Sequence, residues 1–334
     1  MEVVTLAHGS GGGLTSSLIQ NLFRRHFDNK YLAEAHDAAR LPMVPGKLAF
    51  TTDSYVINPL FFPGGNIGKL AVCGTVNDLA MSGARPLYIS CGFIIEDGLP
   101  LPLLEAVVMS MAAAAKEAGV MIVTGDTKVV NKGAADKLFI NTAGIGEIPA
   151  GINIFGGNAQ PGDAVIVSGT LGDHGTAIMV AREQLGLKSA LESDCAPLGG
   201  LVAEMLAVCS NIRVLRDPTR GGAATALNEI AGQSQVGIEI NEESIPINPA
   251  VRGISEILGL DPLYLANEGK LIAIVPAGEA DAVLAAMRSH AYGKDAAIIG
   301  QVLPQPQGKL FMRTPYGSRR ILDIMISDPL PRIC

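Results

Sequence analysis

The sequence lacks the cysteine patterns and the long apolar runs that define several protein classes. Its five cysteines include no Cys-x-x-Cys pair, and any disulfide scheme leaves one of them unpaired. This pattern argues against a disulfide scaffold and favours free thiols in a reducing, cytoplasmic compartment. No stretch of about 18 residues is both strongly apolar and uncharged, so no transmembrane helix is expected. The N-terminus has no basic signal-peptide region.

Charged residues are also scarce, at 17% of the chain, and the net charge is −7. An acidic chain with a pI near 5.3 is a poor partner for nucleic acid or an anionic membrane. Hydrophobic residues make up 48% of the 334 positions, which permits a large core. A chain of this length exceeds the usual limit for one core, so two domains are expected.

Familiar catalytic signatures are absent as well. The sequence has no Ser-His-Asp signature, no His-Glu-x-x-His motif, no zinc-like spacing, no dinucleotide-binding glycine fingerprint and no clear internal repeat. Cys73, Cys91, Cys195 and Cys209 stand at apolar positions typical of packing sites. The chemistry must therefore rest on the 39 glycines and on the acidic residues beside them.

Apolar periodicity and glycine or proline punctuation predict an α+β protein with its domain boundary within 151–162. In the first half we expect strands at 47–52, 86–95, 120–124 and 138–148, and helices at 66–81 and 102–119. In the second half we expect strands at 164–168, 236–240, 271–275 and 296–302, and helices at 176–185, 198–208, 222–231, 250–258 and 279–289.

A glycine-rich loop, His8-Gly9-Ser10-Gly11-Gly12-Gly13, precedes the first helical pattern. Backbone N–H groups at such a helix start can bind phosphate. The loop is not a Walker A motif, because no Gly-Lys-Ser/Thr follows. The alternative is a flexible glycine segment, with His8 simply solvated or packed.

Four aspartates lie at the ends of predicted elements, next to small residues. They are Asp53, Asp78, Asp126 and Asp217. Mg²⁺ is bound by carboxylate and phosphate oxygens together, so convergence of the four would make a site for a magnesium nucleotide. The alternative is that each aspartate caps backbone N–H groups.

Three further charges stand in similar settings. Lys128 follows Asp126 and can neutralise phosphate charge, and Arg220 can contact phosphate or pair with Asp217. Glu268 can act as a general base if burial raises its pKa. The alternative for each is an exposed charge at a turn.

The sequence ends in Pro329-Leu330-Pro331-Arg332-Ile333-Cys334. The prolines disfavour a helix or a central strand. We therefore expect an extended arm of about ten residues, reaching roughly 33 Å, that carries a thiol. The alternative is a frayed terminus with an accidental thiol.

Six motifs in this order, together with the terminal Pro-Arg-Ile-Cys, resemble the HypE family of hydrogenase maturation factors. The motifs are residues 8–12, 52–54, 77–78, 125–130, 217–222 and 267–270. That family is part of the superfamily of aminoimidazole ribonucleotide synthetase and selenophosphate synthetase. The resemblance spans the chain from its first ten residues to its last four.

The resemblance implies a fold. Residues 1–155 would be an ATP-binding domain that forms a homodimer, with the two sheets joined into a barrel. Residues 156–323 would be a C-terminal α+β domain, with ATP in the cleft between the domains. Residues 324–334 would be a flexible tail.

It also implies an activity. The carbamoyltransferase HypF would carbamoylate Cys334, and ATP would drive dehydration of the thiocarbamate to a thiocyanate. The cyanide would pass to iron on a HypC–HypD complex for the [NiFe] hydrogenase. The implied metal ligands for Mg²⁺ are Asp53, Asp78, Asp126 and Asp217. The implied nucleotide-binding residues are Gly11, Gly12, Gly13, Asn77, Thr127 and Arg220. The implied catalytic residues are Cys334 as the carrier, Glu268 as the base and Lys128 as a polarising or relaying group.

One position departs from the family pattern, because Lys137 stands where a small residue, usually glycine, is expected at a turn. Two other functions stay open. A selenophosphate synthetase-like enzyme would carry a reactive Cys or selenocysteine and a Lys near the glycine loop, and residues 8–13 have neither. A nucleotide-gated scaffold would use the terminal thiol only to dock partners.

Overall fold

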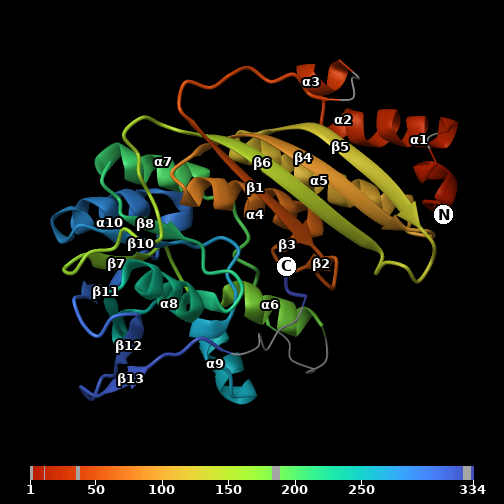
Figure 1. Cartoon of the computed structure of the whole chain (residues 1–334). Coiled ribbons are helices and arrows are strands. Elements are labelled where there is room, and N and C mark those ends of the chain that lie inside the picture. The colour runs from red at the N-terminus through yellow and green to blue at the C-terminus, as the bar shows by residue number, and fades with distance from the viewer. Residues whose placement is uncertain (1–2, 11, 35–37, 183–188, 326–331) are drawn as a thin grey trace.

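The structure, a computed structural model, describes residues 3–10, 12–34, 38–182, 189–325 and 332–334. The described residues form two large sheets and one two-stranded sheet; Figure 1 shows the strands β1, β4, β5 and β6 above and the strands β7 to β13 below, with helices between and around them. The first sheet has the strand order β1-β6-β4-β5. Its strands are β1 (Lys47–Tyr55), β6 (Leu138–Ile148), β4 (Arg85–Glu96) and β5 (Met121–Val130).

Two helices cover one face of this sheet. Helix α4 (Ile67–Met81) begins at Asn66, whose side chain accepts hydrogen bonds from two N–H groups of the first turn. Helix α5 (Leu101–Ala118) ends at Gly119, which has a left-handed φ of 71°. Small side chains let the two helices pack closely: a Cβ at Gly68 would lie 2.4 Å from the carbonyl oxygen of Val107.

The opposite face of the first sheet carries exposed apolar residues. Phe50 on β1 is 71% exposed, and Leu48 on the same strand is also exposed. Alternation along a strand places these residues on the face away from α4. The edge strands β1 and β5 each have one side without a strand partner in the described part of the chain.

The N-terminal helices pack beside β5 and β4. Phe23 lies against Phe93 of β4, with ring centroids 4.8 Å apart. A two-stranded ribbon precedes α4. These elements are η1 (Leu6–Gly9), α1 (Gly13–Leu18), the π-helical turn η2 (Ile19–Phe23), α2 (Arg24–His26), α3 (Lys30–Ala33), β2 (Phe61–Phe62) and β3 (Gly65–Asn66).

The second sheet has the order β13-β12-β9-β11-β7-β10-β8. Its strands are β7 (Ala164–Val167), β8 (Val214–Arg216), β9 (Gly237–Asn241), β10 (Ile272–Val275), β11 (Ala297–Leu303), β12 (Lys309–Arg313) and β13 (Arg319–Ile321). The helices around it are α6 (Asp173–Ala181), α7 (Gly199–Val208), α8 (Gly222–Ser234), α9 (Pro249–Leu258) and α10 (Ala280–Ser289), with short turns η3 (Glu242–Ser244), η4 (Pro262–Tyr264), η5 (Ala277–Glu279) and η6 (Ala291–Gly293).

Most predicted elements are confirmed within a few residues, but two strands are longer than predicted. β1 continues past Asp53, and β5 continues from 124 to Val130. Glycine explains the second case, because a Cβ at Gly125 would lie 2.4 Å from the carbonyl oxygen of Cys91 on β4. Strands β8, β12 and β13 were not predicted; they are short and rich in charge. Residues 183–185, the end of one predicted helix, lie outside the described residues.

The position of Lys137 confirms the turn predicted there. Its φ is 67°, in the left-handed region that favours glycine. The turn is held by Glu96, whose carboxylate accepts the N–H groups of Gly133 and Lys137 at 2.6 and 2.8 Å. The departure from the family pattern is therefore accommodated by a local hydrogen-bonded loop.

The two halves of the chain share their cores. Cys195, Ala266 and Ile333 pack into the apolar cluster of the first sheet, and Met81 of α4 packs into a cluster of the second. Within the described ranges, none of the helices has the length and apolar character that a bilayer crossing requires.

Candidate active site

Two of the predicted carboxylates meet where α4 packs on β1. The Thr51 hydroxyl donates to Asp78 Oδ2 at 2.7 Å, and the Tyr55 hydroxyl lies 3.4 Å from Asp53 Oδ2. A Cβ at Gly74 of α4 would lie 2.3 Å from the Tyr55 hydroxyl oxygen. The small residues of this helix thus allow the side chains of β1 to approach it.

Asp217, just after β8, adds a third negative charge. Burial, the charge of Asp217 and the charge of Asp53 together raise the pKa of Asp78 to about 7, against the lowering effect of its Thr51 hydrogen bond. Burial is also the main cause that raises the pKa of Asp217, and Asp53 raises it further. Three carboxylates in mutual repulsion favour a bound cation.

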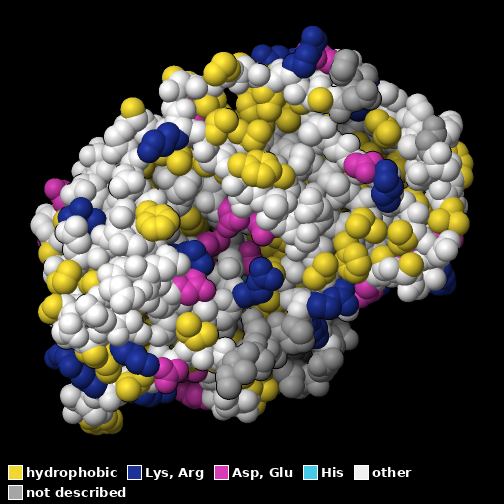
Figure 2. Space-filling view, in the orientation of Figure 1, with side chains coloured by type: hydrophobic (Ala, Val, Ile, Leu, Met, Phe, Trp, Pro, Cys, Tyr) yellow, Lys and Arg dark blue, Asp and Glu magenta, His cyan; other side chains and the backbone are white. Residues whose placement is uncertain are grey.

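This cluster suits a metal shared with a ligand. No three of the described His, Cys, Asp and Glu side chains are already arranged as a complete set of metal ligands. Mg²⁺ is usually held by one or two carboxylates, with substrate phosphates and water in the remaining positions. The donor set therefore fits Mg²⁺ bound together with phosphate. In Figure 2 acidic side chains gather in the middle of the face, with Lys and Arg side chains close by.

Glu268 is buried beside this cluster. Burial is the main cause that raises its pKa well above the ordinary value, and the neighbouring Cys195, Asp217, Asp194 and Asp53 raise it further. Its Oε1 atom is buried without a hydrogen-bond partner among the described residues. An orphaned carboxyl oxygen of high proton affinity is a suitable general base.

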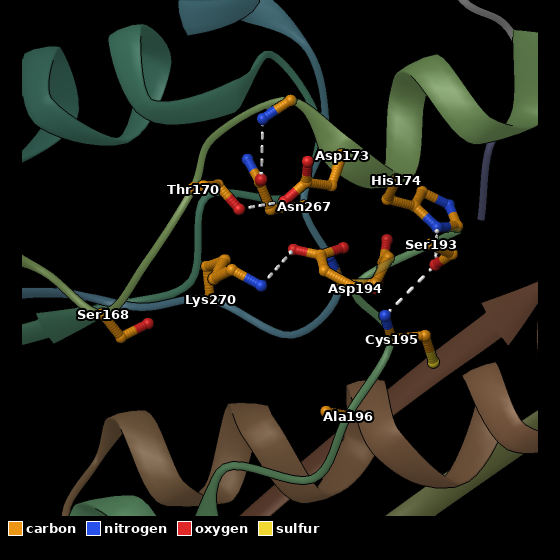
Figure 3. A network of polar contacts seen from close by, with 12 residues as sticks. Ser168, Thr170, Asp173, His174, Ser193, Asp194, Cys195, Ala196, Asn267 and Lys270 are labelled. Atoms are coloured by element: carbon orange, nitrogen blue, oxygen red, sulfur yellow. Dashed lines mark hydrogen bonds and ion pairs between the residues drawn. The ribbon is translucent and has the colours of Figure 1, made fainter. Parts of the chain in front are cut away.

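Sequence reasoning missed the groups that hold Glu268 in place. Asp194 accepts the Glu268 N–H at 3.0 Å and forms an ion pair with Lys270 at 3.4 Å (Figure 3). The neighbouring Gly269 packs so closely that a Cβ would lie 1.7 Å from the Asp194 carbonyl oxygen. Lys270 belongs to the motif of residues 267–270, on which the prediction of Glu268 depends. Asp194 belongs to none of the motifs, and no signal in the sequence singles it out.

Asn77 also fixes backbone groups next to the site. Its amide donates to the carbonyl oxygens of Ala196 and Glu268 at 3.0 and 3.2 Å and accepts the Leu198 N–H at 2.8 Å. The next residue on α4 is Asp78. Asn77 therefore links the metal-binding candidate on α4 to the backbone of the candidate base.

The loop after Asp217 is fixed by Asn267. The Asn267 N–H donates to the Pro218 carbonyl at 3.0 Å, and its side-chain oxygen accepts the Gly172 N–H at 2.8 Å. Gly222 has a φ of 63°, and a Cβ there would lie 2.4 Å from the Leu263 carbonyl oxygen. Arg220, at the tip of this loop, is exposed.

A second group of predicted residues lies on β5. Lys128 Nζ is 2.8 Å from Asp126 Oδ1, and this hydrogen bond is the main cause that lowers the pKa of Asp126. The same carboxylate accepts the Thr127 N–H. With Gly9 of the glycine loop, these residues line a cavity of about 280 Å³. Gly12 and Gly13 have open space around them, and Gly11 lies outside the described residues.

The structure keeps these two groups apart within one chain. Asp126 pairs with Gly92 on β4, Gly92 with Asn141 on β6, and Asn141 with Ser54 on β1, next to Asp53. Three strand spacings of about 4.8 Å separate Asp126 from β1 by about 14 Å. Asp53, Asp78 and Asp217 converge, and Asp126 is not with them.

The last residues are docked rather than extended into solvent. Ile333 is 2% exposed in the core of the first sheet, and Cys334 packs against that core. The Val56 N–H, directly after β1, donates to the main-chain oxygen of Cys334 at 3.2 Å. The thiol-bearing residue therefore lies at the end of the strand that carries Asp53. Residues 326–331 of the predicted arm lie outside the described residues.

Comparisons with known proteins identify the two domains of the chain. Family models of AIR synthase related proteins match the chain twice, the N-terminal domain over residues 35–148 and the C-terminal domain over residues 160–313. The protein is thus a two-domain member of the AIR synthase superfamily.

Two relatives identify the family within this superfamily. The carbamoyl dehydratase HypE of Escherichia coli K12 is 54% identical over the whole of both chains. The carbamoyl dehydratase HypE of Cupriavidus necator is 53% identical over 99% of this chain and 95% of its own. The chain belongs to the HypE family of carbamoyl dehydratases, and the resemblance found in the motifs is confirmed.

Solved structures give the same result. A hydrogenase maturation protein HypE in complex with ATP has a TM-score of 0.95 and 52% identity, with 99% of each chain covered. A HypE chain of a HypE–HypF complex has a TM-score of 0.82 and 51% identity, covering 92% of this chain and all of that one. A thiamine-monophosphate kinase of Stenotrophomonas maltophilia, at 22% identity and a TM-score of 0.68, shares the fold alone.

Proposed function

We propose that this protein uses ATP to dehydrate a carbamoyl group carried on the sulfur of Cys334, giving a thiocyanate. The observation that carries the proposal is the docking of Cys334 at the end of β1, which also bears Asp53, in a region that contains the buried Glu268. The relatives named carbamoyl dehydratase and the relative solved with ATP support the same reaction.

In this proposal Asp53, Asp78 and Asp217 hold Mg²⁺ with the phosphates of ATP. Their mutual repulsion, which raises the pKa of Asp78, is relieved by the bound cation. The metal would offset the charge that develops during phosphoryl transfer. Arg220, which is exposed in the loop after Asp217, would add a positive charge toward the phosphates.

The protein's own groups then handle the protons. The carbamoyl oxygen is a poor leaving group, so it takes the γ-phosphoryl group of ATP and departs as phosphate while ADP remains. Two N–H protons must leave nitrogen as the C≡N bond forms. Glu268 accepts one proton at the carboxyl oxygen that has no partner among the described residues, and the departing phosphate takes the other as monohydrogen phosphate. Lys128 polarises the departing oxygen or relays the proton.

Lys128 and Asp126 reach this site in a homodimer. The exposed apolar face of the first sheet and the open edges of β1 and β5 favour closure of two sheets into one barrel. In that arrangement β5 of one subunit lies beside β1 of its partner. The glycine loop, Thr127 and Lys128 of one chain would thus complete the carboxylate cluster of the other.

The remaining partners follow from the reaction. A carbamoyl donor must load Cys334, and the HypF of the related HypE–HypF complex is the candidate. A HypC–HypD complex would accept the cyanide for the iron of [NiFe] hydrogenase. Five free thiols are consistent with a reducing cytoplasm.

Mass spectrometry of the terminal peptide tests the proposal. With carbamoyl phosphate, HypF and ATP, we expect Cys334 to become lighter by one water than its carbamoylated form. Glu268→Gln should accumulate the carbamoyl form, and Cys334→Ala should still bind ATP. A carbamoyl adduct that persists in the wild type with bound ATP would instead favour a nucleotide-gated scaffold.

A further inference from the structure

The last three residues are clamped by groups from both domains. The carbonyl oxygen of Arg332 accepts from Arg182 Nη2 at 2.8 Å, that of Ile333 lies 2.9 Å from His174 Nε2, and that of Cys334 accepts from the Val56 N–H. Each of these three residues therefore has a main-chain oxygen held by a hydrogen bond.

These hydrogen bonds also hold one residue in an unfavourable backbone conformation. Arg332 has a φ of 55°, in the left-handed region that non-glycine residues rarely adopt. Its side chain reaches Asp136 Oδ2 at 2.9 Å and the Val56 carbonyl at 2.9 Å. Such a conformation persists only where the surrounding contacts hold it, so the docked position of the tail is specified by these contacts.

The tautomer of His174 follows from its two partners. A carbonyl oxygen can only accept, so Nε2 carries the proton that is donated to Ile333. Nδ1 then accepts from the Ser193 hydroxyl at 2.7 Å, and the Ser193 oxygen in turn accepts the Cys195 N–H at 3.1 Å (Figure 3). Burial, which lowers the pKa of His174, agrees with the neutral ring.

The His174 contacts continue toward the candidate base. Ser193 precedes Asp194, whose carboxylate holds the Glu268 N–H. Ala196 in the same loop donates its N–H to the Glu268 carbonyl at 3.4 Å. One short loop, residues 193–196, therefore contacts the docked tail through His174 and the base through its backbone.

We infer that His174, oriented by Ser193, is a positioning residue that holds the docked tail and aligns Cys334 with Glu268. The inference rests on the proposed function for its catalytic consequence only. The docking itself can be measured without ATP, HypF or any turnover.

The first test is the rate at which iodoacetamide alkylates Cys334 in the full-length apo protein. His174→Asn keeps a polar group near Ser193 but is too short to reach Ile333, whereas His174→Gln can still donate to that carbonyl. We expect the His174→Asn variant to be alkylated roughly 5- to 30-fold faster, because that is the factor that the loss of one buried hydrogen bond gives. The alkylation rate of the His174→Gln variant should stay within about threefold of the wild-type rate. His290→Asn, a half-buried histidine that caps the Tyr292 turn, is the matched control and should leave the rate unchanged.

The second test is single-turnover dehydration of carbamoylated protein at saturating ATP. His174→Asn should lower the rate constant at least tenfold with an unchanged Kd for ATP, and His174→Gln should restore most of it. Equal alkylation rates in the wild type and both variants would overturn the inference even if dehydration proceeds. A wild type that is protected from alkylation but never dehydrates would overturn the proposed function and leave the docking role standing.

Discussion

At the scale of single residues, the geometry of the site depends on side chains that hydrogen-bond to the backbone of neighbouring loops. Asn77, Asp194 and Asn267 use their polar atoms to fix three loops around the carboxylates. Their burial means that each substitution leaves a donor or acceptor unpaired, which costs about 1–3 kcal/mol per group. The carboxylates of the site, by contrast, are destabilised by burial and by mutual repulsion, which together raise the pKa of Asp78.

The Asp78→Asn variant should show this destabilisation in its free energy of unfolding. The pKa of Asp78 is about 7 in the folded chain, against an ordinary value of 3.8. Between these values the folded state binds more protons than the unfolded state, so stability falls as pH rises from about 4 to 7. The variant escapes this penalty and should gain roughly 2 kcal/mol in the free energy of unfolding at pH 8.

The measurement is urea denaturation of apo protein with chelator at pH 8 and pH 4. The gain should be absent at pH 4, and Mg²⁺ with ATP should stabilise the wild type more than the variant. Asp295→Asn, an exposed aspartate outside the cluster, serves as the control. An equal change at both pH values would rule out electrostatic relief as the cause.

Residue-level prediction from sequence succeeded where a residue type carries its own chemistry. Asp53, Asp78 and Asp217 do converge, and Glu268 is buried beside them. Asp194 and His174 could not be foreseen, because their roles depend on loops that meet only through tertiary packing. The predicted capping alternative holds for Asp126, which accepts the next N–H, and the carboxylate of Asp217 also has a backbone hydrogen bond, which lowers its pKa.

At the scale of elements, α4 is the helix that packs into the cores of both domains. Its small residues face β1 and α5, and its C-terminal part packs into the second core. The helix and its Asn66 cap were readable from sequence, since capping is local. That Asn77 points at the second domain was not, because helix periodicity says nothing about which neighbour a buried face meets.

Asn77→Ala tests this link between the domains. The substitution removes the hydrogen-bond partner of the Ala196 carbonyl and of the Leu198 N–H and one of the two donors to the Glu268 carbonyl, so we expect a loss of about 2–4 kcal/mol in the free energy of unfolding. Because Asn77 binds the Glu268 carbonyl, dehydration should slow at least tenfold while ATP affinity changes little.

Asn228→Ala is the matched control. Asn228 is also buried and donates to the carbonyl oxygens of Ala224 and Leu322 at 2.8 Å, far along the chain from α4. It should destabilise the protein by a similar amount with the dehydration rate intact. If the two variants lose activity in parallel with stability, Asn77 has no specific role at the site.

Phe50→Asp tests the open face of the first sheet. A carboxylate at this 71% exposed position would have to be buried in a closed barrel, so we expect the homodimer to dissociate in sedimentation velocity experiments. Phe155→Asp replaces a phenylalanine that is 66% exposed in the segment between the domains, and it should leave the dimer unchanged. A dimer that survives Phe50→Asp would place the interface elsewhere.

At the scale of the whole molecule, sequence predicts which residues belong to the site but not how far apart the fold places them. The motifs of residues 125–130 and 217–222 are equally visible in the sequence. The first lies on β5, whereas the second follows β8, and its Asp217 lies close to Asp53 of β1. Strand order decides this separation, and it is set by long-range pairing that local patterns do not encode. Within one chain the group on β5 and the group beside β1 therefore lie about 14 Å apart, and in the proposed dimer they are the two halves of one site.

Complementation between two inactive variants distinguishes a site shared by two subunits from a site within one. Lys128→Gln damages the β5 half and Glu268→Gln the β1 half. If each site takes one half from each subunit, a mixed dimer has one site with both defects and one with neither. Random mixing makes about half of the dimers mixed, so about a quarter of the wild-type dehydration rate should return.

The matched control is a mixture of Glu268→Gln with Asp78→Asn. Both changes fall in the same half, so every site of a mixed dimer keeps one defect and no rate should return. Co-expression with two affinity tags gives each mixed dimer in pure form, where the expected value rises to about half of the wild-type rate. If Lys128→Gln and Glu268→Gln fail to complement in the purified mixed dimer, then Lys128 acts in the site of its own subunit and β5 must move toward β1 when ATP binds.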